Sequence, residues 1–194
     1  YDNDGRLDLL SANGHLEPDI ARVQAGERYD QSAQLFWNSG RPGPGLYVNV
    51  DASAAGPDLF KPMVGRGGAY ADIDGDGDLD VVLTANNGPA RLLRNDGGNA
   101  NHWVRLALTG DGKRSNRDAL GARIEARIGA SVHRRQLFPA RGYLSSVEPT
   151  LTFGLGKAEK IDALTTIWPS GKTTHLENLE MNRMYHIDEV SGLR

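Results

Sequence analysis

The segment DIDGDGDLD, residues 72–80, carries an aspartate at every second position. The five are Asp72, Asp74, Asp76, Asp78 and Asp80. Carboxylates at this density repel one another, and a folded chain rarely holds them without a counter-charge. A hard cation bound by oxygen ligands is the obvious counter-charge. The spacing therefore predicts a metal site in this segment.

Calcium is the cation that the pattern favours. Side chains at positions 1, 3, 5 and 9 of the segment can converge on one ion, and the carbonyl of Asp78 at position 7 can add a ligand. Gly77 permits a sharp turn after the fifth position. Calcium takes six to eight oxygen ligands at roughly 2.3–2.6 Å, whereas magnesium requires stricter octahedral geometry and retains more water. We therefore expect Ca²⁺ as the bound ion.

Two other interpretations of the segment are weaker. An EF-hand loop has glutamate at position 12, but the twelfth residue counted from Asp72 is Leu83, and the pattern of a strand follows instead of a helix. A solvated acidic turn would need no ion. The same acidic pattern occurs again at residues 2–8, however, and repetition favours a ligand-binding role.

The second occurrence belongs to an internal repeat. Residues 1–14, YDNDGRLDLLSANG, align with residues 73–88 at a spacing of 72 residues, and LFWNSG (35–40) aligns with LLRNDG (92–97). Each unit predicts an acidic loop, a strand, an Asn-Gly turn and a second strand. The first unit has 17 additional residues after its turn, for which we expect a loop or a short helix. Its acidic loop is incomplete, because the position equivalent to Asp72 would precede the first residue.

Negative charge is concentrated in these loops. The 194 residues carry a net charge of −3, with 8 Lys/Arg against 15 Asp/Glu in residues 1–102 and 14 against 10 in residues 103–194. The narrow distribution of the acids indicates a site rather than a generally acidic surface. The basic excess of the second half is too thin to predict nucleic-acid binding. No apolar run approaches the roughly 20 residues of a membrane-spanning helix, and the absence of cysteine excludes disulfides.

Residues 103–194 predict a second, small β domain after a Gly/Asn-rich linker at 98–102. WPSGK, residues 168–172, is typical of a hairpin turn. Seven short strands in about 90 residues favour a β-sandwich or barrel, so the whole chain is predicted to be all-β. The segments with alternating apolar residues are 103–110, 119–128, 131–138, 151–156, 161–168, 172–179 and 184–190.

These motifs resemble those of two families. The DxDGDGxxD loop followed by an apolar strand resembles the FG-GAP/VCBS repeat, the calcium-loop blade unit of integrin-α-like β-propellers. Three segments of the second half resemble the ASPIC/UnbV domain, which follows such repeats in the cartilage acidic protein family and in UnbV-like proteins of enediyne gene clusters. These segments are KRSNRDALGARI (113–124), GYLSSVEPTLTFGLG (142–156) and IWPSGK (167–172).

The resemblance implies a fold and a set of ligands. It implies propeller blades in residues 1–97, as part of a longer β-propeller, and an ASPIC/UnbV-like domain in 103–194. It implies calcium at the five aspartates of the 72–80 segment, and it implies no catalytic residues. A partial second calcium site is implied at Asp2, Asp4, Arg6 (through its carbonyl) and Asp8.

Other motifs give weaker functional signals. SGKTT (170–174) ends like a phosphate-binding P-loop, but Thr166 replaces the opening glycine and the segment joins two predicted strands. The five histidines lack the paired spacing of a zinc site. The serines at 145–146 lack a nucleophile-elbow pattern. The arginines at 134–135 are expected as an exposed pair on a strand.

The function expected from these patterns is that of a calcium-binding, extracytoplasmic binding or adhesion module. Such a module would be secreted, periplasmic or at the cell surface, with a protein or carbohydrate partner. Two repeats are too few to close a propeller, and no signal-peptide pattern follows Tyr1, so we expect a piece of a longer protein. Two alternatives remain open: an accessory, non-catalytic part of natural-product (enediyne-like) or polysaccharide processing, and a structural spacer. No catalytic constellation is found, and an enzyme is not expected.

Overall fold

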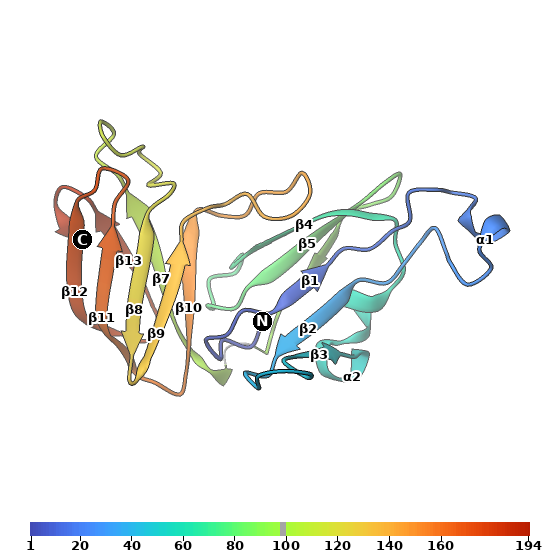
Figure 1. The fold of residues 1–194 in the computed structure, drawn as a ribbon, viewed down its shortest axis with the longest axis horizontal. Coiled ribbons are helices and arrows are strands. Elements are labelled where there is room, and N and C mark those ends of the chain that lie inside the picture. Colours follow the sequence, from blue (N-terminus) through green and yellow to red (C-terminus); the bar gives the residue numbers. More distant parts are fainter. Residues whose placement is uncertain (98–99) are drawn as a thin grey trace.

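The computed structural model describes residues 1–97 and 100–194, which fold mainly as β-strands (Figure 1). Strands make up 44% of the chain and helices 7%, which confirms the all-β class. The strands form two three-stranded sheets in the first half and two four-stranded sheets in the second. None of these four sheets closes on itself.

The first half contains two antiparallel sheets of the same size. One has the strand order β1-β2-β3 and the other β4-β5-β6. The bounds are β1 Leu9–Ser11, β2 Gln34–Asn38, β3 Tyr47–Val50, β4 Gly65–Ala71, β5 Asp80–Ala85 and β6 Arg91–Leu93.

These two sheets share one register. Leu10 of β1 lies opposite Leu35 of β2, and Val82 of β5 lies opposite Leu92 of β6. Positions 10 and 82 are related by the 72-residue spacing seen in the sequence. The strands that follow the two acidic loops therefore pair in the same way, because their apolar residues occupy the same positions relative to the turns.

One apolar core joins the two sheets. Leu35 and Val50 from the first sheet and Leu83 from the second are buried together. Leu59 and Met63, which lie in the connection between the sheets, complete this core. The two sheets therefore pack on each other through one face each.

Within residues 1–97 and 100–194, the helices longer than three residues are short and lie in the first half. The predicted insertion contains the four-residue helix α1 (Ile20–Val23), which lies at the end of the molecule far from the second half (Figure 1). The connection between β3 and β4 contains α2 (Ala52–Ala55) and the 3₁₀ helix η1 (Pro57–Phe60). No helix within the described ranges combines the length and the apolar character that a membrane crossing requires.

The second half is a sandwich of two four-stranded sheets. One has the order β10-β7-β13-β14 and the other β12-β11-β8-β9. All neighbours are antiparallel except β7 and β13, which run parallel. The bounds are β7 His102–Thr109, β8 Arg123–Ile128, β9 Ser131–Gln136, β10 Thr150–Gly156, β11 Lys160–Ile167, β12 Thr173–Glu180, β13 Arg183–Asp188 and β14 Gly192–Leu193.

The seven predicted strands are all present, and β14 is an additional short one. Their alternation is visible in β8, where Ile124, Ala126 and Ile128 are buried and the intervening residues are exposed. Both sheets contribute to one core, which includes Leu106 and Phe153 from the first sheet and the buried residues of β8 from the second. Because two separate sheets enclose this core, the domain is a β-sandwich rather than a barrel.

The linker expected at 98–102 falls partly outside the described residues, and His102 at its end is already the first residue of β7. The WPSGK segment forms the expected hairpin, with Trp168 and Lys172 paired through the Trp168 N–H and the Lys172 carbonyl at 2.9 Å.

The predicted exposed pair of arginines at 134–135 is half wrong. Arg134 is exposed and pairs with Glu125 across the strands at 2.9 Å. Arg135 is half-buried, and its guanidinium lies 5.5 Å from the ring centroid of Phe153. Burial lowers the pKa of Arg135, which Arg141 lowers further and Tyr70 partly offsets. Arg135 lies opposite the buried Ile124 of β8, so its side chain points to the inner face of that sheet, and its Nη2 donates to the Gly5 carbonyl of the first half at 3.3 Å.

Candidate metal centre

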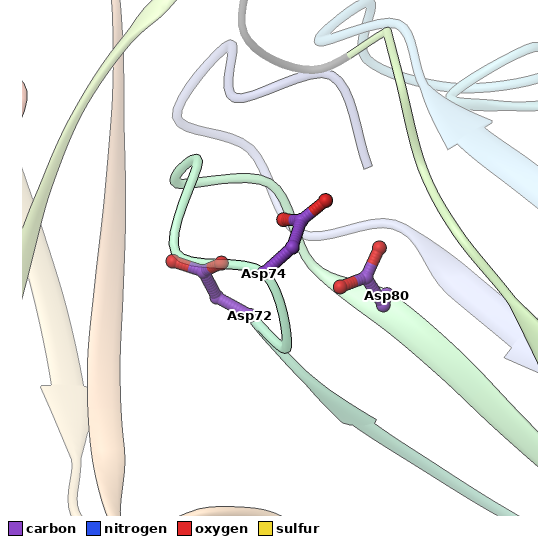
Figure 2. Close-up of side chains that lie close together, drawn as sticks. All are labelled: Asp72, Asp74 and Asp80. Carbon is purple, nitrogen blue, oxygen red and sulfur yellow. The ribbon is translucent and has the colours of Figure 1, made fainter.

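The acidic loop connects β4 to β5, which are antiparallel neighbours. Ala71 at the end of β4 lies opposite Asp80 at the start of β5, so the loop closes on itself. Asp72 follows β4 directly and Asp74 lies between the two strand ends. One carboxylate oxygen each of Asp72, Asp74 and Asp80 lies within 4.8 Å of the others, and in Figure 2 Asp74 is seen between Asp72 and Asp80.

Backbone N–H groups of the loop orient the first of these carboxylates. Asp72 accepts hydrogen bonds from Gly75 at 2.8 Å and from Gly77 at 3.1 Å. Both glycines have positive φ, +80° and +96°, a conformation that L-residues adopt only with strain. The alternation of aspartate with glycine therefore serves the fold of the loop as well as its charge.

The last carboxylate of the trio is held from two sides. Asp80 is 1% exposed and accepts hydrogen bonds from the N–H groups of Ile73 at 2.9 Å and Asn95 at 2.8 Å. Asp74 is exposed, and the nearest guanidinium nitrogen, that of Arg94, is 3.8 Å away. Two fixed carboxylates and one open to solvent leave an access route for an ion.

The donor chemistry of this trio fits a hard cation. All three groups offer carboxylate oxygens, which calcium and magnesium prefer over softer metals. The groups come from separate residues and gather within the distance that ligands of a single ion span. The residues could therefore hold a hard cation, and calcium as that ion stays a prediction.

The other two aspartates of the predicted ligand set lie outside the trio. Asp76 accepts a hydrogen bond from the Asp78 N–H at 2.9 Å. Asp78 is fully buried, and its carboxylate accepts a hydrogen bond from the Asn3 amide at 3.2 Å. Their roles as ligands, including that of the Asp78 carbonyl, stay predictions.

The first acidic loop has the same backbone design. Asp8 accepts from the N–H of Asn38 at 2.8 Å, as Asp80 does from Asn95. The α-amino group of Tyr1 bonds to Asp8 in the way that the Ile73 N–H bonds to Asp80. The two loops are therefore built alike at their C-terminal ends.

Two carboxylates of the first loop, those of Asp2 and Asp4, bond to side chains of the first half itself. The indole N–H of Trp37 donates to Asp2 at 3.0 Å and to Asp4 at 3.3 Å, and Arg6 pairs with Asp4. In the part of the chain that the structure describes, Asp2, Asp4 and Asp8 do not form a trio like that of the second loop. The partial site, with the Arg6 carbonyl, stays a prediction. Burial raises the pKa of the Tyr1 phenol, and the carboxylates of Asp2, Asp8 and Asp4 raise it further.

Sequence reasoning missed the residues that meet the second loop from the sandwich. Arg105 of β7 is 6% exposed, and its Nη1 lies 2.7 Å from Oδ2 of Asp72. Its Nη2 pairs with Glu148, which also accepts a hydrogen bond from the Asp72 N–H at 3.2 Å. Arg105 alternates with the buried Val104 and Leu106, so the strand pattern places it on an exposed face. Asp72 of the first half and Glu148 of the second half both pair with its guanidinium in the folded chain.

A separate polar cluster accounts for the SGKTT segment. Glu189, 3% exposed, accepts hydrogen bonds from Ser170 and from the Asp111 N–H at 2.9 Å, and Lys172 donates to its carbonyl. Burial raises the pKa of Glu189, but hydrogen bonds from Ser170, Asp111 and Ser115 outweigh it, so the pKa lies below its ordinary value. The segment thus fixes the hairpin between β11 and β12 and follows a strand rather than opening a helix.

Comparison with known proteins bears on the second half of the chain. Residues 112–194 match the family described as ASPIC and UnbV. The chain is 34% identical to cartilage acidic protein 1 of Homo sapiens over 129 residues, covering 63% of this chain and 19% of that protein. It is 32% identical to cartilage acidic protein 1 of Xenopus tropicalis over 178 residues, covering 89% of this chain and 25% of that protein. The chain thus spans about a fifth to a quarter of these relatives.

These matches confirm the ASPIC/UnbV part of the resemblance, whereas the FG-GAP part stays a prediction. One solved structure, provisionally described as a cell adhesion protein from Bacteroides uniformis, aligns over 98% of this chain and 89% of that chain. Its sequence identity is 9% and its TM-score 0.28, which is too low to establish a shared fold.

Proposed function

We propose that this chain is a calcium-binding module of a secreted or cell-surface protein with a binding or adhesion role. The single observation that carries the proposal is the trio of Asp72, Asp74 and Asp80, whose carboxylate oxygens gather within 4.8 Å. The relatedness to cartilage acidic protein 1 and the ASPIC and UnbV match of residues 112–194 support an extracellular setting.

In this proposal the two three-stranded sheets are FG-GAP/VCBS blades of a longer β-propeller. Their common register and shared core support this assignment. Each sheet also has an apolar residue on its outer face, Leu9 at 51% exposure and Leu92 at 60%, where a neighbouring blade would pack.

Calcium would have a structural role at the loop. A cation held by Asp72 and Asp80 ties the end of β4 to the start of β5, and it neutralises carboxylates that otherwise repel one another. A ligand that binds only the folded state adds RT ln(1 + [L]/Kd) to stability, about 2.7 kcal/mol at one hundred times Kd. Extracellular calcium modules function with a Kd as weak as about 10⁻⁴–10⁻³ M.

Calorimetric titration of the full chain with calcium tests the proposal. We expect saturable binding and a rise in Tm that EDTA reverses. Asp74→Asn should abolish both effects with little change of Tm in EDTA, because Asp74 is exposed. Asp96→Asn is a matched control, since Asp96 is an exposed aspartate that pairs with the same Arg94 at 2.7 Å. Absence of calcium binding by the unmutated chain at millimolar concentration would refute the proposal.

A further inference from the structure

An aromatic side chain of the sandwich lies against each acidic loop, at glycines that are equivalent in the two repeats. Gly5 and Gly77 occupy the same position in the two repeats and have φ values of +92° and +96°. A Cβ added at Gly77 would lie 1.9 Å from atoms of the Trp103 indole. A Cβ added at Gly5 would lie 3.1 Å from Cε1 of His133. The same backbone turn is therefore the docking point of an aromatic side chain in each repeat.

The backbone of the sandwich also contacts the first loop closely. The Gly156 N–H donates to the Asn3 carbonyl at 2.9 Å. A Cβ on Gly154, which pairs with Trp103 across β10 and β7, would lie 2.5 Å from the Asn3 carbonyl. No side chain larger than that of glycine fits there without displacing the loop.

The first loop in turn contacts the second one. The side-chain amide of Asn3 donates to the Gly77 carbonyl at 3.1 Å and to the Asp78 carboxylate at 3.2 Å. Asn3 thus joins both loops to β10 at one point. The two loops and the sandwich form a single contact surface, which we call the loop junction, made by Asn3, Gly5, Asp72, Gly77, Trp103, Arg105, His133, Glu148, Gly154 and Gly156.

Charge at the junction is balanced around Arg105. Its guanidinium pairs with Asp72 on one side and with Glu148 on the other, both within the buried contact. The negative charge of Glu148 neutralises the positive charge of Arg105. Arg105 can therefore pair with Asp72 without adding a net positive charge beside the cation site. Asp72 keeps its Oδ1 on the side of the loop, where it accepts the Gly75 N–H.

We propose that cation binding at the 72–80 loop and docking of the sandwich onto the loops are coupled, so that each strengthens the other. The inference rests on the proposed function. The sandwich contacts the loop in the same conformation that gathers the three carboxylates, and without a cation their repulsion favours other loop conformations. Two events that select the same conformation promote each other equally, because a coupling free energy is reciprocal.

Hydrogen exchange on the unmutated full chain tests the coupling without any substitution. The reporter is the Gly156 N–H, which belongs to the sandwich but bonds to the first loop. We expect its exchange to slow about fivefold or more when calcium replaces EDTA, the lower range of typical coupling between sites. Amides of β11, which pairs with β8 and β12, serve as the internal reference and should change less.

Calorimetric titration of variants with calcium measures the reciprocal effect. Trp103→Ala and Gly154→Val both disturb docking without altering a charge, and each should weaken calcium binding about fivefold or more. Arg134→Gln is the matched control, because Arg134 is exposed on the sandwich and should leave the affinity unchanged.

The outcomes separate the two proposals. If the unmutated chain fails to bind calcium, the proposed function fails, and the coupling fails with it. If the chain binds calcium but Gly156 exchanges equally fast with and without it, and if the folded docking variants bind calcium as tightly as the control, only the coupling is overturned.

Discussion

Arg105 and Asp72 form a buried ion pair between the two halves of the chain, with Nη1 2.7 Å from Oδ2. The pair joins β7, a strand of the sandwich, to Asp72, the first residue of the acidic loop. Side-chain exposures of 7% and 1% mean that solvent screens this contact little. Breaking this pair should therefore lower the free energy of unfolding more than breaking an exposed ion pair of the protein.

Replacing Arg105 with Met should destabilise the chain strongly. The change leaves the buried carboxylate of Asp72 and the partly buried one of Glu148 without their cation, and loss of one partner from a buried pair costs about 3–5 kcal/mol. Urea unfolding in EDTA measures the loss. Arg134→Met, which breaks the exposed pair with Glu125, should cost about 0–1 kcal/mol. Equal losses from both variants would contradict a special role for Arg105.

Gly77→Ala should be more destabilising than Gly75→Ala. Both glycines have positive φ, which costs an L-residue about 1–2 kcal/mol. Only at Gly77 does the added methyl group meet the Trp103 ring, and overpacking adds about 1–3 kcal/mol. A Cβ at Gly75 has no atom within 4 Å. Thermal unfolding in EDTA compares the two, and identical Tm values would show that Trp103 does not press on the loop in solution.

Asp76→Ala tests the ligand that the sequence predicts but the trio does not include. If Asp76 binds calcium, the variant loses most of the calcium-dependent stability, about 2.7 kcal/mol when calcium is at one hundred times Kd. In EDTA it loses only the hydrogen bond from the Asp78 N–H. Tm values with calcium and with EDTA give the answer: a loss of the same size in both would mean that Asp76 serves only the turn.

Asp111→Asn should lower stability at neutral pH and lose this effect in acid. The N–H groups of Lys113 and Ser115, aided by that of Arg114, hold the pKa of Asp111 below its ordinary value. All three donate to Oδ1 at 2.8–2.9 Å, and an asparagine oxygen can accept them in the same place. The substitution therefore removes the charge and keeps the geometry.

The sign of this pH dependence follows from linkage. A carboxyl whose pKa is lower in the folded state stabilises the fold above its unfolded pKa, about 3.9 for aspartate. The contribution is lost as the pH falls through the lower, folded pKa. Urea midpoints should thus differ between the two chains near pH 7, and the difference should vanish as the pH falls through the folded pKa of Asp111. A constant difference across this range would rule out the charge as the cause.

Separation of the chain between residues 97 and 100 should give two pieces of unequal behaviour. The piece from His102 onward contains all the residues of the sandwich core and should unfold cooperatively by itself. Residues 1–97 would expose the loop junction and the outer faces at Leu9 and Leu92, and should associate. Light scattering and thermal melts of both pieces check this. A monomeric, cooperative 1–97 beside a disordered 102–194 would contradict the architecture.

Local features of this protein were predictable from its sequence. Alternation of apolar residues located seven strands of the sandwich, because side-chain direction in a strand has a period of two. The 72-residue repeat located two strands with a common register. The Asp/Gly alternation of residues 72–80 located a loop in which Asp72, Asp74 and Asp80 do meet, since their separation is short and the glycines allow the turn.

Only the tertiary structure decided which surfaces meet. Strand β7 pairs in parallel with β13, nearly eighty residues later, and no local pattern encodes that neighbour. Arg105 lies on the face of β7 away from the sandwich core, yet its pair with Asp72 is buried, and Arg135 donates to the Gly5 carbonyl of the first half at 3.3 Å. Sequence periodicity reports which face of an element is apolar, whereas contacts such as Trp103 on Gly77 depend on how two finished surfaces fit. That fit is set by shape and charge across distant segments, so it is absent from any single stretch of sequence.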